Sequence, residues 1–274
     1  MRLRNALDVS AFTPKRLPQA RPSRGWLSRE EAIAAADLYR TLALGFSYPE
    51  PGLVDGVRRG IDAALIAQRA GELPARLAGL LRNAARSWRD ASLEGLSSEH
   101  SRLFLGSALV PMREGGYGDG LRFAGQPVDL ADLNGFYLAF GFGPPPTAAS
   151  PPDHLGTELE FMSLLNLKTA YAIERRGREQ AEITRAAMRR FLEDHLGRWV
   201  EAFSVSLRQA DAAPAYASLA GLVTRAVESD AHRLGATLTR AGPGTAADPV
   251  GLDALTCPLA GEARPDSAAS PDAM

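Results

Sequence analysis

The chain has 274 residues, enough for one large or two small domains with a full hydrophobic core. Its 31 Lys and Arg residues are balanced by 32 Asp and Glu residues, which argues against a general nucleic-acid-binding protein, because such proteins carry a basic surface. The single cysteine, Cys257, excludes an intramolecular disulfide and a cysteine metal cluster. No long uncharged apolar run occurs, and none near the N-terminus resembles a secretory signal. We therefore expect a cytoplasmic protein without a transmembrane segment.

The two ends of the chain differ in composition from the part between them. Residues 1–25 are rich in Pro and Arg, with six basic residues against one acidic residue. Residues 243–274 are rich in Pro, Ala and Gly, with five acidic residues against one basic residue. Neither end contains a periodic set of apolar residues. We therefore expect a disordered basic arm over 1–25, a folded domain over 26–242 and a disordered acidic tail over 243–274.

Helical periodicity fills the first half of the predicted domain. The pattern of Ser28 followed by Glu31 is a capping box, and it predicts a helix that stops at Pro49. Apolar residues at helical spacing predict further helices at 53–65, 74–88 and 97–105. Residues 106–124 then form a Gly-rich loop. This loop is longer than most structureless connections, so we expect it to be functional or mobile.

The second half continues the helical pattern. A helix is predicted at 128–140, prolines interrupt the chain at 144–146 and 151–152, and a long helix follows to about residue 176. Three more helices end near Leu238. No segment shows the sustained alternation of a strand, so we predict an all-α, single-domain, non-repetitive bundle of about 8–11 helices.

The junction between the proline-rich stretch and the long helix is the most distinctive part of the sequence. We predict that Asp153 caps this helix, because an Asp side chain at that position can accept the first free backbone N–H groups. A broad apolar stripe indicates a deeply packed helix and consists of Leu155, Leu159, Met162, Leu164, Leu165 and Leu167. The positive end of a helix favours anions. We therefore expect function at the Asp153–His154 pair.

Signs of catalysis are weak. The Gly-rich run at 115–118 follows no strand and lacks the Lys-Ser/Thr ending of a phosphate loop, and there is no serine nucleophile elbow. His154 with Glu158, and Glu228 with His232, have the i, i+4 spacing of helical metal ligands. The Glu-x-x-His triplet of di-iron bundles is absent, however. We expect no metal and no cofactor.

Five segments occur in an order that carries more information than any single residue. They are residues 38–49, 99–106, 135–142, 152–162 and 191–199. The fourth reads Pro-Asp-His-Leu-Gly-Thr-Glu-Leu-Glu-Phe-Met, and the second contains Leu103-Phe104-Leu105-Gly106. Together they resemble the TorD/DmsD/NarJ family of redox-enzyme maturation chaperones over about residues 30–240. His100 stands where the family has an aromatic residue, and the loop after Gly106 is unusually Gly-rich. Both departures bear on the choice of client.

The resemblance implies an all-α cytoplasmic chaperone without catalytic activity. Its partners would be the apo form of a molybdopterin oxidoreductase subunit of the DMSO reductase family and the twin-arginine signal peptide of that subunit. It would assist cofactor insertion and delay export, as a monomer or a domain-swapped dimer. A carboxylate for a guanidinium and a groove for the apolar run would serve this task. The residues implied in signal-peptide binding are Leu103, Phe104, Pro111, Tyr117, Asp153, His154 and Glu158.

Two alternatives stay open at this point. The first is a metal-dependent helical-bundle enzyme, in which His154 and Glu158 would bind the metal. The second is a permanent structural subunit of a redox complex. The identity of the client cannot be derived from this chain.

Overall fold

The computed structural model describes residues 26–118, 126–143 and 151–242. Within these ranges the chain forms nine α-helices and two short 3-10 helices and contains no strand, which confirms the predicted all-α, single-domain fold. The α-helices are α1 (Arg29–Gly45), α2 (Pro51–Arg69), α3 (Ala78–Asp90), α4 (Leu93–Phe104), α5 (Gln126–Ala139), α6 (Leu155–Glu174), α7 (Arg178–Asp194), α8 (Leu196–Gln209) and α9 (Pro214–Leu234). The 3-10 helices are η1 (Ala75–Leu77) and η2 (Glu114–Gly116). The predicted basic arm, acidic tail and first proline cluster lie outside the described residues.

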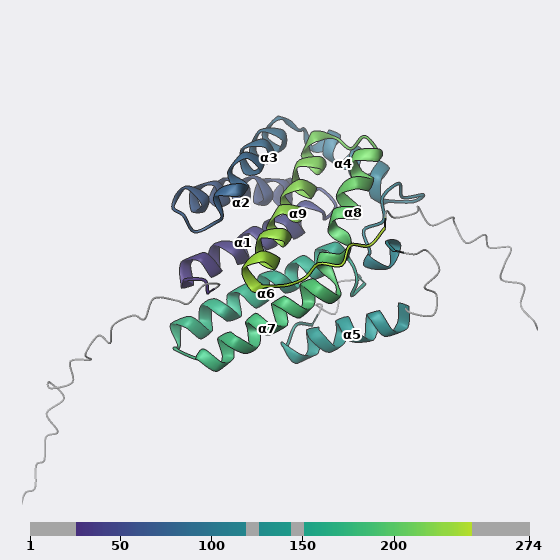
Figure 1. The fold of residues 1–274 in the computed structure, drawn as a ribbon. Helices are drawn as coiled ribbons and strands as arrows, with labels where there is room; N and C mark the ends of the chain where they lie inside the picture. The colour runs from purple at the N-terminus through teal and green to yellow at the C-terminus, as the bar shows by residue number, and fades with distance from the viewer. Residues whose placement is uncertain (1–25, 119–125, 144–150, 243–274) are drawn as a thin grey trace, which may run out of the picture.

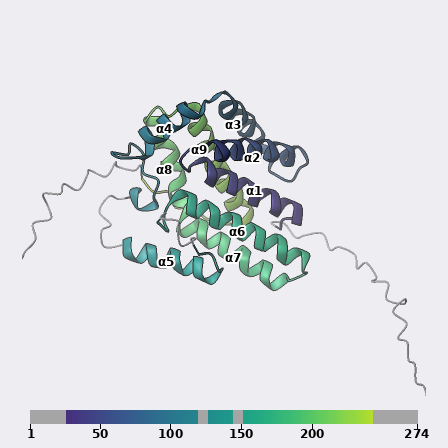
Figure 2. The same ribbon diagram turned by 180° about the vertical axis from the view of Figure 1, so that it is seen from behind.

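Helix α6 lies at the centre of the lower half of the molecule, between α1 and α7 (Figures 1 and 2). Its apolar stripe is fully buried at Leu155, Leu159, Met162 and Leu165, as predicted. The two remaining residues of the predicted stripe differ, because Leu164 is only partly buried and Leu167 is exposed. Helix α9 packs along α8 and α3 and closes the core from the other side.

Helix α1 shows how local sequence fixes an element. Ser28 Oγ accepts a hydrogen bond from Glu31 N at 3.1 Å, and the Glu31 carboxylate accepts one from Ser28 N, so the predicted capping box is confirmed. Leu38 and Leu42 are buried, also as predicted. The helix ends at Gly45, four residues before Pro49. A side chain at Gly45 would meet the end of the Leu219 side chain of α9, so a larger residue here would force Leu219 to shift.

Several helix boundaries and one helix face differ from the sequence prediction. Helix α4 begins at Leu93, earlier than expected, because Ser92 Oγ accepts a hydrogen bond from Gly95 N at 3.0 Å. Helix α9 ends at Leu234 because Gly235 adopts a left-handed conformation with φ 69°. In α7 Ile183 is exposed, and the buried face instead contains Thr184 and Met188.

The middle of the Gly-rich loop is tied to the start of α6. Glu114 N donates to Asp153 O at 2.9 Å, and Leu155 N donates to Met112 O at 2.9 Å. These bonds belong to an isolated antiparallel bridge between Arg113 and His154. The described part of this loop is therefore an ordered wall beside α6.

Helix α5 is attached through aromatic rings. Phe136 and Tyr137 pack edge-on against Phe161 of α6, with centroid distances of 6.4 and 4.9 Å. Phe136 also packs against Phe191 of α7 at 5.6 Å. This helix thus lies beside α7 at the edge of the bundle (Figure 1). None of the described helices is long and apolar enough to cross a membrane.

Candidate functional site

His154, and not Asp153, caps the long helix. His154 Nδ1 accepts a hydrogen bond from Gly156 N at 3.1 Å, and the His154 backbone is extended with ψ 139°. The predicted capping role of Asp153 is therefore wrong by one residue. Because His154 Nδ1 is an acceptor, its proton lies on Nε2. Burial lowers the pKa of His154, which favours this neutral form.

Asp153 instead forms an ion pair with Arg113 across the antiparallel bridge. The Arg113 Nε lies 3.0 and 3.2 Å from the two carboxylate oxygens, and Nη2 lies 3.0 Å from Oδ1. The Asp153 side chain is only 8% exposed, whereas the Arg113 side chain is 52% exposed. The bridge brings the two side chains together, and this pairing was not predicted because it joins residues 40 positions apart.

An open apolar groove of about 610 Å³ lies beside this pair. It runs between the end of α1, the end of α4 and the start of α6. Its lining consists of Phe46, Ser47, Tyr48, His100, Phe104, Leu105, Ala108, Pro111, Met112, Arg113, Gly115, Gly116, Asp153 and His154. Tyr48 and Leu105 are 49% and 48% exposed, so the groove has an apolar and accessible rim.

Phe104 belongs to both the groove and the aromatic core. It is partly buried, and its ring lies 5.6 Å from Tyr216 and 6.4 Å from Phe203. His100 takes part in the same cluster, with centroids 5.0 Å from Phe104 and 5.4 Å from Tyr48. Burial lowers the pKa of His100. His100 therefore fills the aromatic position of the motif as a neutral ring.

Leu103 and Tyr117 lie away from the groove. Leu103 is fully buried on the inner face of α4, and its interpretation as a groove wall is wrong, because one residue along a helix turns the side chain by about 100°. Tyr117 stacks on Trp199 with centroids 5.3 Å apart. It donates a hydrogen bond to Pro111 O at 2.8 Å, so it supports the groove wall from behind.

A second, smaller cavity of about 190 Å³ lies on the other side of the Arg113–Asp153 pair. Its lining consists of Arg113, Glu114, Gly115, Tyr117, Gly118, Leu130, Asp153, Arg198, Trp199, Thr239, Arg240, Ala241 and Gly242. Arg113, Gly115 and Asp153 border both cavities. The ion pair is therefore the wall between them.

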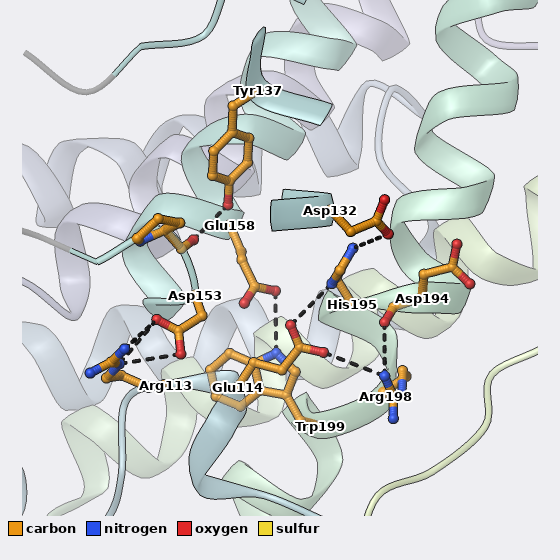
Figure 3. A network of polar contacts seen from close by, with 11 residues as sticks. Arg113, Glu114, Asp132, Tyr137, Asp153, Glu158, Asp194, His195, Arg198 and Trp199 are labelled. Atoms are coloured by element: carbon orange, nitrogen blue, oxygen red, sulfur yellow. Dashed lines mark hydrogen bonds and ion pairs between the residues drawn. The ribbon is translucent and has the colours of Figure 1, made fainter. Parts of the chain in front are cut away.

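A buried polar network supports this wall (Figure 3). Glu114 is buried and lies 3.1 Å from His195 Nδ1 and 3.8 Å from Arg198 Nη1. His195 Nε2 lies 3.2 Å from an Asp132 oxygen. The network thus joins η2, α5 and the start of α8. Segment 191–199 is one of the five sequence motifs, but the sequence alone assigns no role to its His195.

The geometry of His195 favours a positive charge. Both ring nitrogens face carboxyl oxygens, and a ring with a proton on each nitrogen can donate to both of them. Burial alone would lower the pKa of His195, but the hydrogen bonds and charges of Glu114 and Asp132 outweigh it and raise the pKa above its ordinary value. The cation neutralises part of a carboxylate-rich centre.

Glu158 lies beneath the site, where it cannot touch a ligand. It is fully buried, its Oε2 accepts a hydrogen bond from Trp199 Nε1 at 3.2 Å, and its Oε1 has no hydrogen-bond partner among the described residues. Burial, and next the charge of Glu114, raise its pKa well above the ordinary value. The implied place of Glu158 among the residues that contact a signal peptide is therefore wrong.

The i, i+4 pairs do not assemble ligand sets in the described ranges. No group of three His, Cys, Asp or Glu side chains there is placed to hold a metal ion. Glu228 instead contacts Arg225 at 3.2 Å and Arg240 at 3.7 Å.

Comparison with known proteins identifies the family of this chain. The helical bundle and its open groove first define the chain as an all-α protein with an accessible apolar site. The family model for the nitrate reductase delta subunit matches residues 68–205. The selenate reductase assembly chaperone protein of Thauera selenatis is 36% identical over 214 residues, which cover 76% of this chain and 93% of that protein. A solved structure of a candidate redox enzyme maturation protein from Archaeoglobus fulgidus aligns with a TM-score of 0.45 and 16% identity over 70% of this chain and 93% of that one.

The chain therefore belongs to the nitrate reductase delta subunit family, which confirms the resemblance to TorD/DmsD/NarJ proteins derived from its five motifs. It is an assembly chaperone and not an enzyme.

Proposed function

We propose that this protein is a cytoplasmic maturation chaperone for a molybdopterin oxidoreductase. It binds the twin-arginine signal peptide and the apo form of the catalytic subunit, assists cofactor insertion and delays export until the cofactor is in place. The observation that carries the proposal is the position of Asp153 at the edge of an open apolar groove with an exposed rim. The relationship to a selenate reductase assembly chaperone supports a reductase as the client.

The site matches the two chemical parts of such a peptide. An apolar run can bury its side chains against Tyr48, Phe104 and Leu105, and the free energy of burying apolar surface then drives association. A guanidinium at the adjoining end can reach Asp153, and charge-assisted pairs with a planar guanidinium select orientation. The peptide groove thus comprises Phe104, Pro111, Asp153 and His154 among its lining residues.

Titration of the full chain with signal peptides tests this proposal. The probes are the twin-arginine peptide of a candidate reductase and the same peptide with both arginines changed to glutamine. We expect the glutamine peptide to bind about ten- to a hundredfold more weakly, the equivalent of one charge-assisted hydrogen bond. Equal binding of both peptides, or binding of neither, would contradict the proposal.

A rim variant locates the groove in the same assay. Leu105→Asp places a charge on the exposed rim and should weaken the peptide at least tenfold while the melting temperature stays near that of the unchanged protein. Ile66→Asp is the matched control, because Ile66 is also a large exposed apolar residue but lies on α2 outside the groove lining. Proteins retained by the unchanged chain and lost with Leu105→Asp, identified by mass spectrometry, then name the client.

A further inference from the structure

The carboxylate of Asp153 is already paired with a guanidinium of the same chain. Arg113 reaches both oxygens of Asp153 through Nε and touches Oδ1 again through Nη2, with all three distances between 3.0 and 3.2 Å. Asp153 is buried, so little of its carboxylate edge remains open. An arginine of a ligand therefore cannot simply be added to this pair.

Among the described residues that line the groove, Asp153 is the only acidic one. The other carboxylates nearby are engaged or inaccessible, since Glu114 faces His195 and Arg198, and Glu158 is fully buried below Trp199. In the described part of the groove, a cationic group that enters therefore meets no second carboxylate. Such a cationic group must therefore compete with Arg113 for Asp153.

The Arg113 side chain can separate from Asp153 while the Arg113 backbone keeps its place. The backbone around it is fixed to α6 by the bonds from Glu114 N to Asp153 O and from Leu155 N to Met112 O. Its side chain is half exposed, so release into water requires no opening of the core. The pair can therefore break without disturbing the loop that carries Arg113.

We propose that Arg113 occupies the place of the client's arginine, and that binding exchanges one guanidinium for another at Asp153. This inference rests on the function proposed above and explains how the groove would select arginine peptides. In the free protein the pair is neutral, so the groove does not attract cations in general. Because the client's arginine must first displace Arg113, only part of its pairing with Asp153 appears as affinity, and burial of the apolar run contributes the rest. Only a planar fork can replace the contacts that Arg113 gives up, so lysine peptides are rejected.

The test is a titration of the full chain, of Arg113→Gln and of Arg240→Gln with three peptides that share one apolar run and carry twin arginine, twin lysine or twin glutamine. In Arg113→Gln the competitor is gone, so we expect the arginine and lysine peptides to bind about tenfold tighter or more, and the preference for arginine over lysine to shrink. Arg240→Gln removes one positive charge near the second cavity, where Arg240 pairs with Glu201 at 2.7 Å, and should change neither affinity nor preference.

The possible results separate this inference from the function on which it rests. If no peptide binds the unchanged chain, the proposed function fails. The exchange alone is wrong if the arginine peptide binds the unchanged chain but does not bind Arg113→Gln more tightly. The exchange is also wrong if Arg240→Gln tightens peptide binding as much as Arg113→Gln does.

A second measurement needs no substitution and covers the case that Arg113→Gln does not fold. In a nitrogen-15 NMR spectrum of the unchanged chain, the Nε–H signal of Arg113 should be protected from solvent exchange by its bond to Asp153. Addition of the twin-arginine peptide should abolish that protection, and the twin-glutamine peptide should leave it in place. Protection that survives saturation with the arginine peptide would overturn the exchange.

Discussion

Asp153 and His154 are neighbours in the chain and do different work at the start of α6. His154 closes the helix end through Nδ1, and Asp153 holds the loop through Arg113. A capping residue and an ion-paired residue look alike in sequence, because either is a polar side chain just before an apolar stripe. The distinction depends on Arg113, which the fold brings from 40 residues away.

Because Asp153 and His154 have different roles, we expect different results for Asp153→Asn and His154→Asn. Asp153→Asn keeps one acceptor for Arg113 and loses the charge, so we expect a cost of about 1 kcal/mol in unfolding free energy and at least tenfold weaker binding of the arginine peptide. His154→Asn retains a capping acceptor and should leave stability within about 0.5 kcal/mol. Thermal melting and peptide titration measure both. A larger loss of stability for His154→Asn than for Asp153→Asn would contradict the assignment of the cap.

Leu103 and Phe104 form a second matched pair, adjacent in sequence and different in surroundings. Leu103→Ala removes a fully buried side chain and should lower the unfolding free energy by about 2–5 kcal/mol without changing peptide affinity at a temperature where the variant is folded. Phe104→Ala should cost less than the roughly 3–5 kcal/mol of a fully buried Phe, because the ring is partly exposed to the groove.

Peptide titration beside the melt decides whether this assignment holds. Phe104→Ala should weaken binding through loss of apolar contact, and Leu103→Ala should not. The opposite pattern, weaker binding for Leu103→Ala alone, would place the groove on the other face of α4.

At the scale of elements, His195 is the point where η2, α5 and α8 meet (Figure 3). Its cation bonds two carboxylates that come from residues 63 and 81 positions away. His195 therefore connects the loop that carries Arg113 to helix α5, which carries Tyr137. Loss of the proton leaves only one donor for two acceptors, which loosens one of the two elements.

This arrangement gives stability a pH dependence with a definite sign. Because the folded pKa of His195 is raised above 6.5, its contribution is complete below pH 6.5 and is lost as the pH rises through the folded pKa. Glu158 acts in the same direction, since its pKa is also raised. Melting temperature should therefore decline on the alkaline side. His195→Gln, measured from pH 6 to 9, should be less stable at pH 6 and show a shallower decline.

The exposed His232 at the end of α9 provides the control for this series. His232→Gln should keep the full alkaline decline, because no carboxylate pair surrounds it among the described contacts. A His195→Gln profile parallel to that of the unchanged protein would show that His195 carries no extra proton in the fold.

The sequence predicted the helices better than it predicted the site, and the reason is physical. Both the apolar stripe of α6 and the capping box of α1 consist of residues that follow one another within four positions. Periodicity was therefore sufficient to predict helix α6, and cap chemistry was sufficient to predict the start of α1. The Arg113–Asp153 pair and the His195 network depend on contacts between distant segments. Short motifs marked both regions, but the partners became visible only when the chain was folded.

At the scale of the whole molecule, the described helices share one continuous apolar core. Every buried apolar residue of the main cluster lies between Ala34 and Leu234. The last described segment, residues 236–242, runs across α7 and α8 in extended form (Figure 1). Ala241 N donates to Arg198 O at 2.7 Å, and Arg240 pairs with Glu201. This segment also lines the second cavity and so belongs to the folded domain.

Two shortened chains test where the folded domain ends. A chain over residues 26–242 keeps the main cluster and the extended segment, so we expect it to melt cooperatively within about 2 °C of the full chain and to bind the arginine peptide equally well. A chain over residues 26–235 loses the contacts of Ala241 and Arg240. Loss of about 1–2 kcal/mol should lower its melting temperature by roughly 2–8 °C. The groove lies outside this segment, so peptide affinity should persist in both. A large loss of stability in the 26–242 chain would show that the arm or the tail contributes to the fold.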